Sequence, residues 1–265
     1  MKLRLVRADP AGNITLFVLD PVEKSERAGV AARLMERSEL RAEQVGFACE
    51  PERGVDGCME MAGGEFCGNA SRAYGMLTAR RRGVTGFSRL TLRVSGSERT
   101  LKVDVDMARG TARSEMPLPR LALARAVSGL EGTVVDLGGI VHFVTHIRPD
   151  ETVMERLSPL FGAPRETGGF AGAGAYGVIF LHDGRLTPLV RVPAANTQVW
   201  EGSCGSGSLA AAVAESLGAA DGAFARDYVQ PAGTIRAELA RREGRLIAAS
   251  IGGSVTLGEE ITVEL

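Results

Sequence analysis

Two of the four cysteines in this chain of 265 residues stand in matching surroundings. Cys67 is followed by Gly-Asn-Ala-Ser-Arg-Ala and Cys204 by Gly-Ser-Gly-Ser-Leu-Ala, so that Cys, Gly, Ser and Ala recur at the same offsets. In both segments a run of small residues predicts a helix that begins directly after the cysteine. We therefore expect the two thiols at the N-termini of two helices.

A helix N-terminus offers unpaired N–H groups and the positive end of the helix dipole. Both stabilise a thiolate, so we expect the pKa of each thiol to lie below its ordinary value of about 8.5. Gly68 and Gly205 follow the two cysteines and allow the backbone to approach a ligand closely. The same N–H groups suit a substrate carboxylate, because helix N-termini bind anions.

Two such thiols fit a two-base reaction on an amino acid. One thiolate would remove the Cα proton from one face, and the other thiol would supply a proton to the opposite face. N–H groups on the carboxylate would stabilise the developing carbanion. The residues thus predict a racemase or epimerase. Two alternatives stay open at this point: a thiol–disulfide redox switch, because low-pKa cysteines are readily oxidised, and two small buried residues at tight helix starts.

Residue patterns along the chain predict short strands interrupted by single helices. The strands are expected at 2–7, 14–19, 88–95, 99–106, 133–137, 140–147, 187–192, 233–240, 245–251 and 260–265. The helices are expected at 23–37, 68–82, 150–160 and 205–218. This irregular order indicates an α+β fold. Pro117 and Pro119 predict a crossover between two halves at 115–130, because proline resists both helix and central strand.

The composition excludes several classes of protein. A net charge of −1 gives no general attraction to nucleic acid or to anionic membranes. No apolar run approaches the ~20 residues that span a bilayer, and the first residues alternate like a strand rather than a signal peptide, so we expect a cytoplasmic protein. The four cysteines are too few for a disulfide scaffold and do not join the three histidines at zinc-site spacings, so we expect no metal. Cys49 and Cys58 are expected to be structural or incidental.

Further polar residues stand where they could contact a substrate. Asn13 precedes a predicted strand, Asn69 and Ser206 hold matching positions in the first turns of the two helices, and His142 follows a Gly-Gly pair. Each also has a structural interpretation, such as a turn residue for Asn13, a helix cap for Asn69 or a core histidine for His142. The Gly-rich run at 168–174 lacks a Walker lysine and is expected to be a flexible loop.

The two Cys-Gly helices, the segment Ala-Gly-Asn-Ile-Thr-Leu-Phe-Val-Leu-Asp at 11–20 and Gln44 before Val-Gly-Phe together resemble the diaminopimelate epimerase superfamily. The resemblance covers the whole chain and implies that Asn13 and Gln44 lie near the substrate. It implies two pseudo-symmetric domains, 1–117 with 257–265 and 118–256, each with mixed or antiparallel strands wrapped around a central helix and with the site between them. It also implies a homodimer that needs neither pyridoxal phosphate nor metal.

Several strings depart from the diaminopimelate epimerases. Met-Ala-Gly-Gly-Glu-Phe-Cys-Gly-Asn and Trp-Glu-Gly-Ser-Cys-Gly-Ser-Gly are more similar to the histidine racemase branch, which is associated with opine-type metallophores. Glu65 and Glu201, two and three residues before the cysteines, could meet a substrate amine or imidazole, with a salt bridge or a solvated turn as the alternative for Glu201. Trp200 could supply an apolar wall. The resemblance favours histidine as substrate, with diaminopimelate or another small acid as the alternative.

Overall fold

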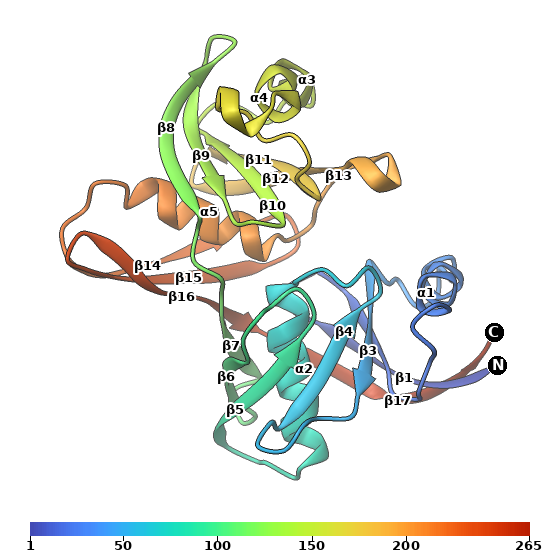
Figure 1. Ribbon diagram of the computed structural model, residues 1–265. Helices are drawn as coiled ribbons and strands as arrows, with labels where there is room; N and C mark the ends of the chain where they lie inside the picture. The colour runs from blue at the N-terminus through green and yellow to red at the C-terminus, as the bar shows by residue number, and fades with distance from the viewer. The chain divides into compact units, whose positions relative to one another are not determined.

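The chain forms two compact units, which the computed structural model describes over all 265 residues apart from the side chain of Ala195 (Figure 1). Unit 1 comprises Met1–Met116 and Ile251–Leu265, and unit 2 comprises Pro117–Ser250. Both termini therefore belong to unit 1. Among the described residues, no helix has both the length and the apolar character needed to cross a membrane.

Unit 1 consists of strands arranged around a central helix, α2 (Gly68–Arg81), with a second helix, α1 (Arg27–Met35), outside them (Figure 1). Its strands are β1 (Lys2–Asp9), β2 (Thr15–Val18), β3 (Gln44–Cys49), β4 (Gly57–Met61), β5 (Phe87–Val94), β6 (Leu101–Asp106), β7 (Thr111–Glu115) and β17 (Thr256–Glu264). Strand β2 is buried on both faces, and a different helix covers each face. Phe17 packs into the apolar cluster around α2, whereas Leu16 and Val18 point the other way into the cluster that contains α1.

Unit 2 has the same plan around α5 (Gly205–Glu215). Its strands are β8 (Leu121–Val127), β9 (Leu130–Asp136), β10 (Ile140–Thr145), β11 (Ala175–His182), β12 (Arg185–Val192), β13 (Thr197–Trp200), β14 (Gly222–Val229), β15 (Thr234–Arg242) and β16 (Arg245–Ser254), the last of which ends in unit 1. Two short helices, α3 (Val153–Arg156) and α4 (Ser158–Gly162), take the place that α1 has in unit 1.

The order of parallel and antiparallel pairs is repeated in the two units. In unit 1, β2 pairs with β3 in parallel, β3 with β4 antiparallel, β4 with β5 in parallel and β5 with β6 antiparallel. In unit 2, β10 and β11, β11 and β12, β12 and β14, and β14 and β15 repeat this series. The strand pairing that surrounds α2 in unit 1 is thus equivalent to the pairing that surrounds α5 in unit 2. The predicted α+β fold, with pseudo-symmetric halves around central helices, is confirmed.

Several elements differ from their predictions. The crossover expected over 115–130 contains the regular strand β8, which pairs with β9, because both prolines lie before the strand and leave its hydrogen bonds intact. The helix expected over 150–160 is two short helices, and Pro159 lies in the first turn of the second one, where proline is tolerated.

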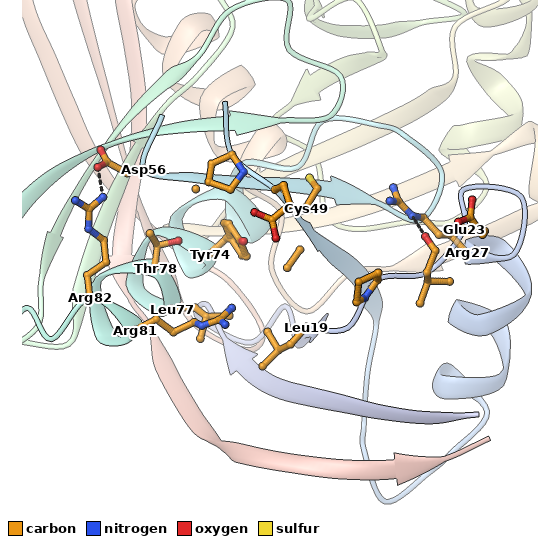
Figure 2. Close-up of a pocket in the computed structure, with 16 residues that line it drawn as sticks. Leu19, Glu23, Arg27, Cys49, Asp56, Tyr74, Leu77, Thr78, Arg81 and Arg82 are labelled. Carbon is orange, nitrogen blue, oxygen red and sulfur yellow. Dashed lines mark hydrogen bonds and ion pairs between the residues drawn. The ribbon is translucent and has the colours of Figure 1, made fainter. Parts of the chain in front are cut away.

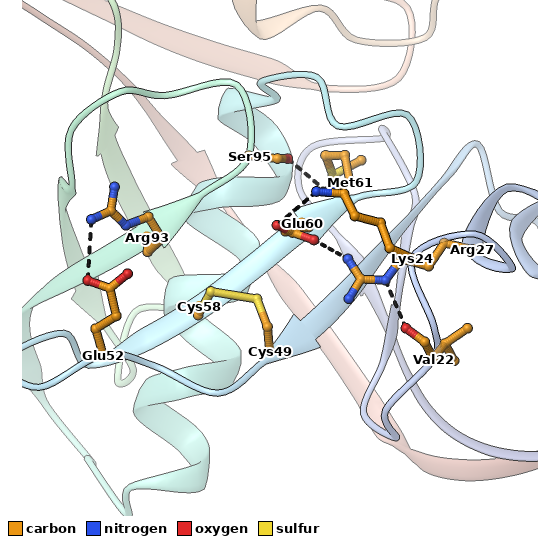
Figure 3. Close-up of a disulfide and its surroundings, with 10 residues drawn as sticks. All are labelled: Val22, Lys24, Arg27, Cys49, Glu52, Cys58, Glu60, Met61, Arg93 and Ser95. Carbon is orange, nitrogen blue, oxygen red and sulfur yellow. Dashed lines mark hydrogen bonds and ion pairs between the residues drawn. A yellow bond between two sulfur atoms is a disulfide. The ribbon is translucent and has the colours of Figure 1, made fainter.

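A disulfide joins Cys49 and Cys58 in unit 1 (Figure 3). The two residues lie directly opposite each other on the antiparallel strands β3 and β4, with Cα atoms 5.0 Å apart. This distance lies within the range of protein disulfides. The bridge gives these cysteines a structural role that their spacing alone does not reveal.

A cavity of about 440 Å³ lies within unit 1 beside the C-terminal half of α2 (Figure 2). Tyr74, Thr78 and Arg81 of α2 line it together with Leu19. Cys67 does not line it, because that residue stands at the other end of the helix.

Candidate active site

Cys67 is the N-cap residue of α2, as predicted. Its extended backbone turns into the helix, and its Sγ accepts a hydrogen bond from the backbone N of Ala70 at 3.4 Å. Ser71 Oγ donates back to the carbonyl of Cys67 at 2.7 Å. The thiol is half-buried and held at the point where the first-turn N–H groups emerge.

Asn13 and Gln44 meet beside this helix N-terminus. Gln44 begins β3, next to β2 in parallel register with Thr15. Its Nε2 donates to Asn13 Oδ1 and to Thr15 Oγ1, both at 2.7 Å. The Gln44 side chain also lowers the pKa of the Cys67 thiol, against the larger effect of burial. The two residues expected near the substrate thus share one cluster with Cys67.

Asn69 lies in the first turn of α2 and is 1% exposed. Its Nδ2 donates to Asn13 Oδ1 at 3.4 Å. Its Oδ1 accepts a bond of 3.2 Å from Nε of Arg72, a fully buried guanidinium. Asn69 therefore joins the cluster of Asn13, Gln44 and Cys67 to the interior of unit 1.

Glu65 and Gly68 flank Cys67. Glu65 is exposed, and its charge raises the pKa of the thiol, which shows that the carboxylate lies near the sulfur. Gly68 opens α2, and a Cβ there would lie 2.5 Å from Met116 Sδ. A larger residue at this position would therefore have to displace the side chains of Met116 and Ile251 in unit 1.

Cys204 repeats the arrangement in unit 2. It is the buried N-cap of α5, and its Sγ accepts a hydrogen bond from the backbone N of Gly207 at 3.3 Å. Gly205 is the first helical residue and is buried. Ser206 Oγ lies 3.4 Å from the sulfur. The matching sequence offsets therefore produce matching local structures.

His142 lies behind Ser206 rather than at the surface. It is fully buried on β10, and its Nε2 is 2.9 Å from Ser206 Oγ. Nδ1 is buried and has no hydrogen-bond partner among the described residues. Burial lowers the pKa of His142 to about 3, so the ring is neutral at physiological pH. His142 therefore reaches the thiol through Ser206, and a direct substrate contact stays a prediction.

Glu201 is half-buried and lies near the Cys204 thiol. Its charge and a hydrogen bond from the protonated thiol both raise the pKa of Cys204. Trp200, one residue earlier, is 44% exposed and its ring centroid lies 5.8 Å from that of Phe180. An acidic side chain thus stands beside this thiol, while the ring of Trp200 packs against Phe180.

The expectation of low thiol pKa values is wrong for the substrate-free protein. Burial raises the pKa of Cys67 and raises that of Cys204 well above its ordinary value. The backbone N–H groups at both helix starts lower the pKa, as expected, but desolvation of the charged sulfur outweighs them. Both thiols are therefore protonated before substrate arrives.

Three residues of these clusters were not predicted as parts of the site. Arg72 donates a hydrogen bond to Asn69, and Glu43 accepts one from Asn13. Gln230, 2% exposed, accepts from the backbone N of Cys204 and donates to Ser208 Oγ, both at 2.8 Å. An arginine amid small residues of a buried helix is a signal that could have identified Arg72. Gln230 is far from Cys204 in the sequence and carries no such signal.

No group of three or more His, Cys, Asp or Glu side chains within the described part of the chain is placed to hold a metal ion. The polar groups at both helix starts are instead thiols, hydroxyls, amides and backbone N–H groups, with the carboxylates of Glu65 and Glu201 close to the two thiols. These groups suit a small carboxylate-bearing ligand.

Comparison with known proteins identifies the family of the chain. Residues 2–262 match the family model described as "Histidine racemase CntK N-terminal domain". A histidine racemase of Fusobacterium nucleatum is 31% identical over 218 residues, or 78% of either chain. One from Staphylococcus aureus is 25% identical over 256 residues, or 94% of this chain and 92% of the relative.

A solved hydroxyproline epimerase from Agrobacterium vitis has the same fold. Its TM-score is 0.64 at 12% identity, and the match covers 99% of this chain and 92% of the other. The family model and the relatives confirm the predicted resemblance, including the branch, and place the protein among the isomerases. This chain belongs to the histidine racemase family.

Proposed function

We infer that this protein interconverts L- and D-histidine, and we propose Cys67 and Cys204 as its two acid–base residues. The observation that carries the proposal is the equivalence of the two thiols. Each is the N-cap of the central helix of its unit and accepts a hydrogen bond from a first-turn N–H group. Family membership favours histidine over diaminopimelate.

In the proposed reaction, the carboxylate of histidine accepts hydrogen bonds from free N–H groups at the helix starts. Its ammonium group brings a positive charge to the neutral thiols and favours one thiolate, whose proton is released to solvent as substrate binds, because a nearby positive charge lowers a thiol pKa. That sulfur takes the proton from Cα, and the other thiol then gives its proton to the opposite face. The electron pair left on Cα in between is delocalised into the bound carboxylate. One turnover exchanges the protonation states of the two sulfurs.

The side chain of the substrate calls for a further contact. We propose that Glu65 and Glu201 recognise the amine and the imidazole, because each carboxylate lies close enough to a thiol to raise its pKa. Trp200 offers an exposed ring next to Glu201. The neutral variant Glu201→Gln should raise KM for histidine, while the protein stays folded.

Incubation with L-histidine in deuterated buffer under reducing conditions tests the proposal. Racemisation with deuterium at Cα is expected, and the variants Cys67→Ala and Cys204→Ala should each lose turnover by at least about 1,000-fold. The Cys49→Ala/Cys58→Ala double variant is the matched control, since it removes two cysteines but neither helix cap. Parallel incubations with meso-diaminopimelate and with proline should show no exchange. Full turnover in either single variant would refute the two-base assignment.

We also propose that the protein acts in the cytoplasm, as expected from its sequence composition, and as a homodimer, as the superfamily resemblance implies. The mass of the protein in solution by light scattering, and its location by cell fractionation, test these two points. A monomer with full activity would contradict the first.

A further inference from the structure

The cavity beside the C-terminal half of α2 has no part in the proposed reaction (Figure 2). Its volume of about 440 Å³ lies within the range of small-molecule sites. The lining residues all fall between Leu19 and Arg82, so unit 1 alone forms it. A cavity of this size holds either water or a ligand, and the groups that face it decide which.

Tyr74 and Thr78 bring two hydroxyl groups to this cavity from successive turns of α2. Tyr74 is 5% exposed and Thr78 7%, and the Tyr74 ring packs edge-on against Phe17 with the ring centroids 5.3 Å apart. Neither hydroxyl has a hydrogen-bond partner among the described residues. Buried polar groups of native proteins almost always have a partner. A molecule in the cavity can supply one to both hydroxyls.

Gly57 of β4 keeps the space beside these hydroxyls open. It also lines the cavity, and a Cβ at this position would lie 2.8 Å from Thr78 Oγ1 and 3.2 Å from Tyr74 Cε1. Any larger residue would therefore press against both side chains. The glycine leaves the two hydroxyls accessible to a bound molecule.

The charges around the cavity balance, but not all of them are paired. Three acidic and three basic residues line it: Glu23, Glu50, Asp56, Arg27, Arg81 and Arg82. Arg82 pairs with Asp56, and Arg27 pairs with Glu60, which does not line the cavity. The third basic residue, Arg81, and the other two acidic residues have no ion-pair partner within the described part of the chain. An unpaired cation and unpaired carboxylates around one cavity fit a ligand with charges of both signs.

Two of these unpaired charges act on Tyr74. Arg81 lowers the pKa of its hydroxyl and Glu50 raises it, whereas the largest effect is burial, and together they raise this pKa to about 12. The hydroxyl therefore stays protonated and able to donate at physiological pH. Leu19, Val22 and Leu77 add apolar surface to the same cavity. An aliphatic group placed against them would be removed from water.

We propose that this cavity is a second binding site of the protein, for a free α-amino acid with an aliphatic side chain of about the size of leucine. The carboxylate of the ligand pairs with Arg81 and accepts hydrogen bonds from the hydroxyls of Tyr74 and Thr78. Its ammonium group pairs with Glu50, and its side chain lies against the apolar residues. This site is independent of the proposed function, because it contains neither of the two proposed acid–base residues.

Titration of the full chain with L-leucine, followed by NMR of its leucine and valine methyl groups, tests the proposal. The methyl signals of Leu19, Val22 and Leu77 should shift and reach saturation, whereas those of Leu209 and Val213 in α5 should stay in place. Two analogues each lack one charge of leucine: 4-methylpentanoate has no ammonium group and 3-methylbutylamine has no carboxylate. Each should bind at least about tenfold more weakly, because it loses a charge-assisted contact.

Three variants locate the contacts. Tyr74→Phe keeps the buried ring and removes only the hydroxyl, and Arg81→Gln and Glu50→Gln each remove one exposed charge. Each should raise the Kd for L-leucine about tenfold. Arg33→Gln, an exposed arginine of α1 outside the cavity, is the matched control and should leave the Kd unchanged. Unshifted signals from α5 show that each variant is folded.

The measurement needs no turnover, so its result does not depend on whether the protein racemises histidine. The proposal would be overturned if the signals of Leu19 and Leu77 did not shift, since the cavity would then hold only water. It would also be overturned if 4-methylpentanoate or 3-methylbutylamine bound as tightly as leucine, or if Tyr74→Phe and Arg81→Gln left the affinity unchanged.

Discussion

A side chain at Gly177 would collide with His142. The two residues lie opposite each other on the parallel strands β10 and β11, and a Cβ added at Gly177 would lie 2.1 Å from His142 Nδ1. The glycine therefore creates the space in which the buried ring reaches Ser206. Strand β11 therefore affects the Cys204 thiol through His142, whose Nε2 lies within hydrogen-bond distance of Ser206, next to the sulfur.

Gly177→Ala should displace His142 and separate it from Ser206. We expect kcat/KM to fall at least about tenfold and the free energy of unfolding to fall by about 1–3 kcal/mol, as for other overpacked cores. Steady-state racemisation and urea unfolding measure the two effects. Gly162→Ala is the matched control in unit 2, because no atom lies within 4 Å of a Cβ there. Normal kinetics in Gly177→Ala would show that the position of His142 is unimportant.

His142 should make the protein sensitive to acid. Its pKa is lowered by burial to about 3, compared with about 6.5 in an unfolded chain. As the pH falls below 6.5, the unfolded chain takes up a proton that the native ring refuses, so stability is full above 6.5 and is lost as the pH falls toward 3. We expect up to about 1.4 kcal/mol per pH unit from this residue. Urea unfolding at pH 7, 6 and 5 should show this slope in the wild type, and His142→Gln should remove it; equal slopes would mean that the native ring is protonated.

Glu201 should slow the alkylation of Cys204. Its charge and its hydrogen bond raise the thiol pKa, after the larger effect of burial. In a Cys67→Ala background, Glu201→Gln should shift the pH profile of iodoacetamide reaction at Cys204 toward lower pH and speed the reaction several-fold at pH 8. Glu215→Gln, at the other end of α5, serves as control. A profile that moves to higher pH would contradict the assigned cause.

The raised thiol pKa values also affect stability. A thiol with a native pKa above its unfolded value of about 8.5 contributes stability below that pH and loses it as the pH rises through the native pKa. The melting temperature of the substrate-free protein should therefore fall above pH 8.5, and this fall should be smaller in Cys204→Ala. Differential scanning calorimetry from pH 7 to 10 measures it.

Reduction of the Cys49–Cys58 bridge should weaken unit 1 without stopping catalysis. A disulfide that closes a loop of this length contributes about 2–3 kcal/mol. The Cys49→Ala/Cys58→Ala variant should lose this amount in urea unfolding, and its kcat should stay within about twofold of the wild type. Loss of turnover in the folded variant would place the hairpin in the catalytic machinery.

Features that depend only on residues close together in the chain could be predicted from the sequence. The two helix starts are visible because small residues and the Cys-Gly pair lie within one turn, and both form as expected. Strand β11 was not predicted, because it is apolar on both faces and its residues do not alternate between apolar and polar. Strand β14 escaped for the opposite reason, since almost all of its residues are exposed.

The chemistry around the thiols could not be predicted in the same way. The pKa of Cys204 depends on how deeply the folded unit buries the sulfur, which no local pattern encodes. Gln230 reaches the backbone of Cys204 only because β14 and the turn after it lie beside the start of α5. Arg72 stands inside the cysteine motif, but its guanidinium can be buried only because the carbonyls of Pro10 and Ser254, far away in the chain, accept its hydrogen bonds.

The chain leaves unit 1 at Met116 and returns to it only at Ile251. On the ribosome, therefore, all of unit 2 is synthesised before β17 can pair with β1 and before Ser254 can accept the hydrogen bond from Arg72. The helix that carries Cys67 is among the first elements to be made and among the last to be locked in place. A nascent chain that lacks β17 thus contains both cysteines but an unfinished unit 1, which delays activity until this strand has been made.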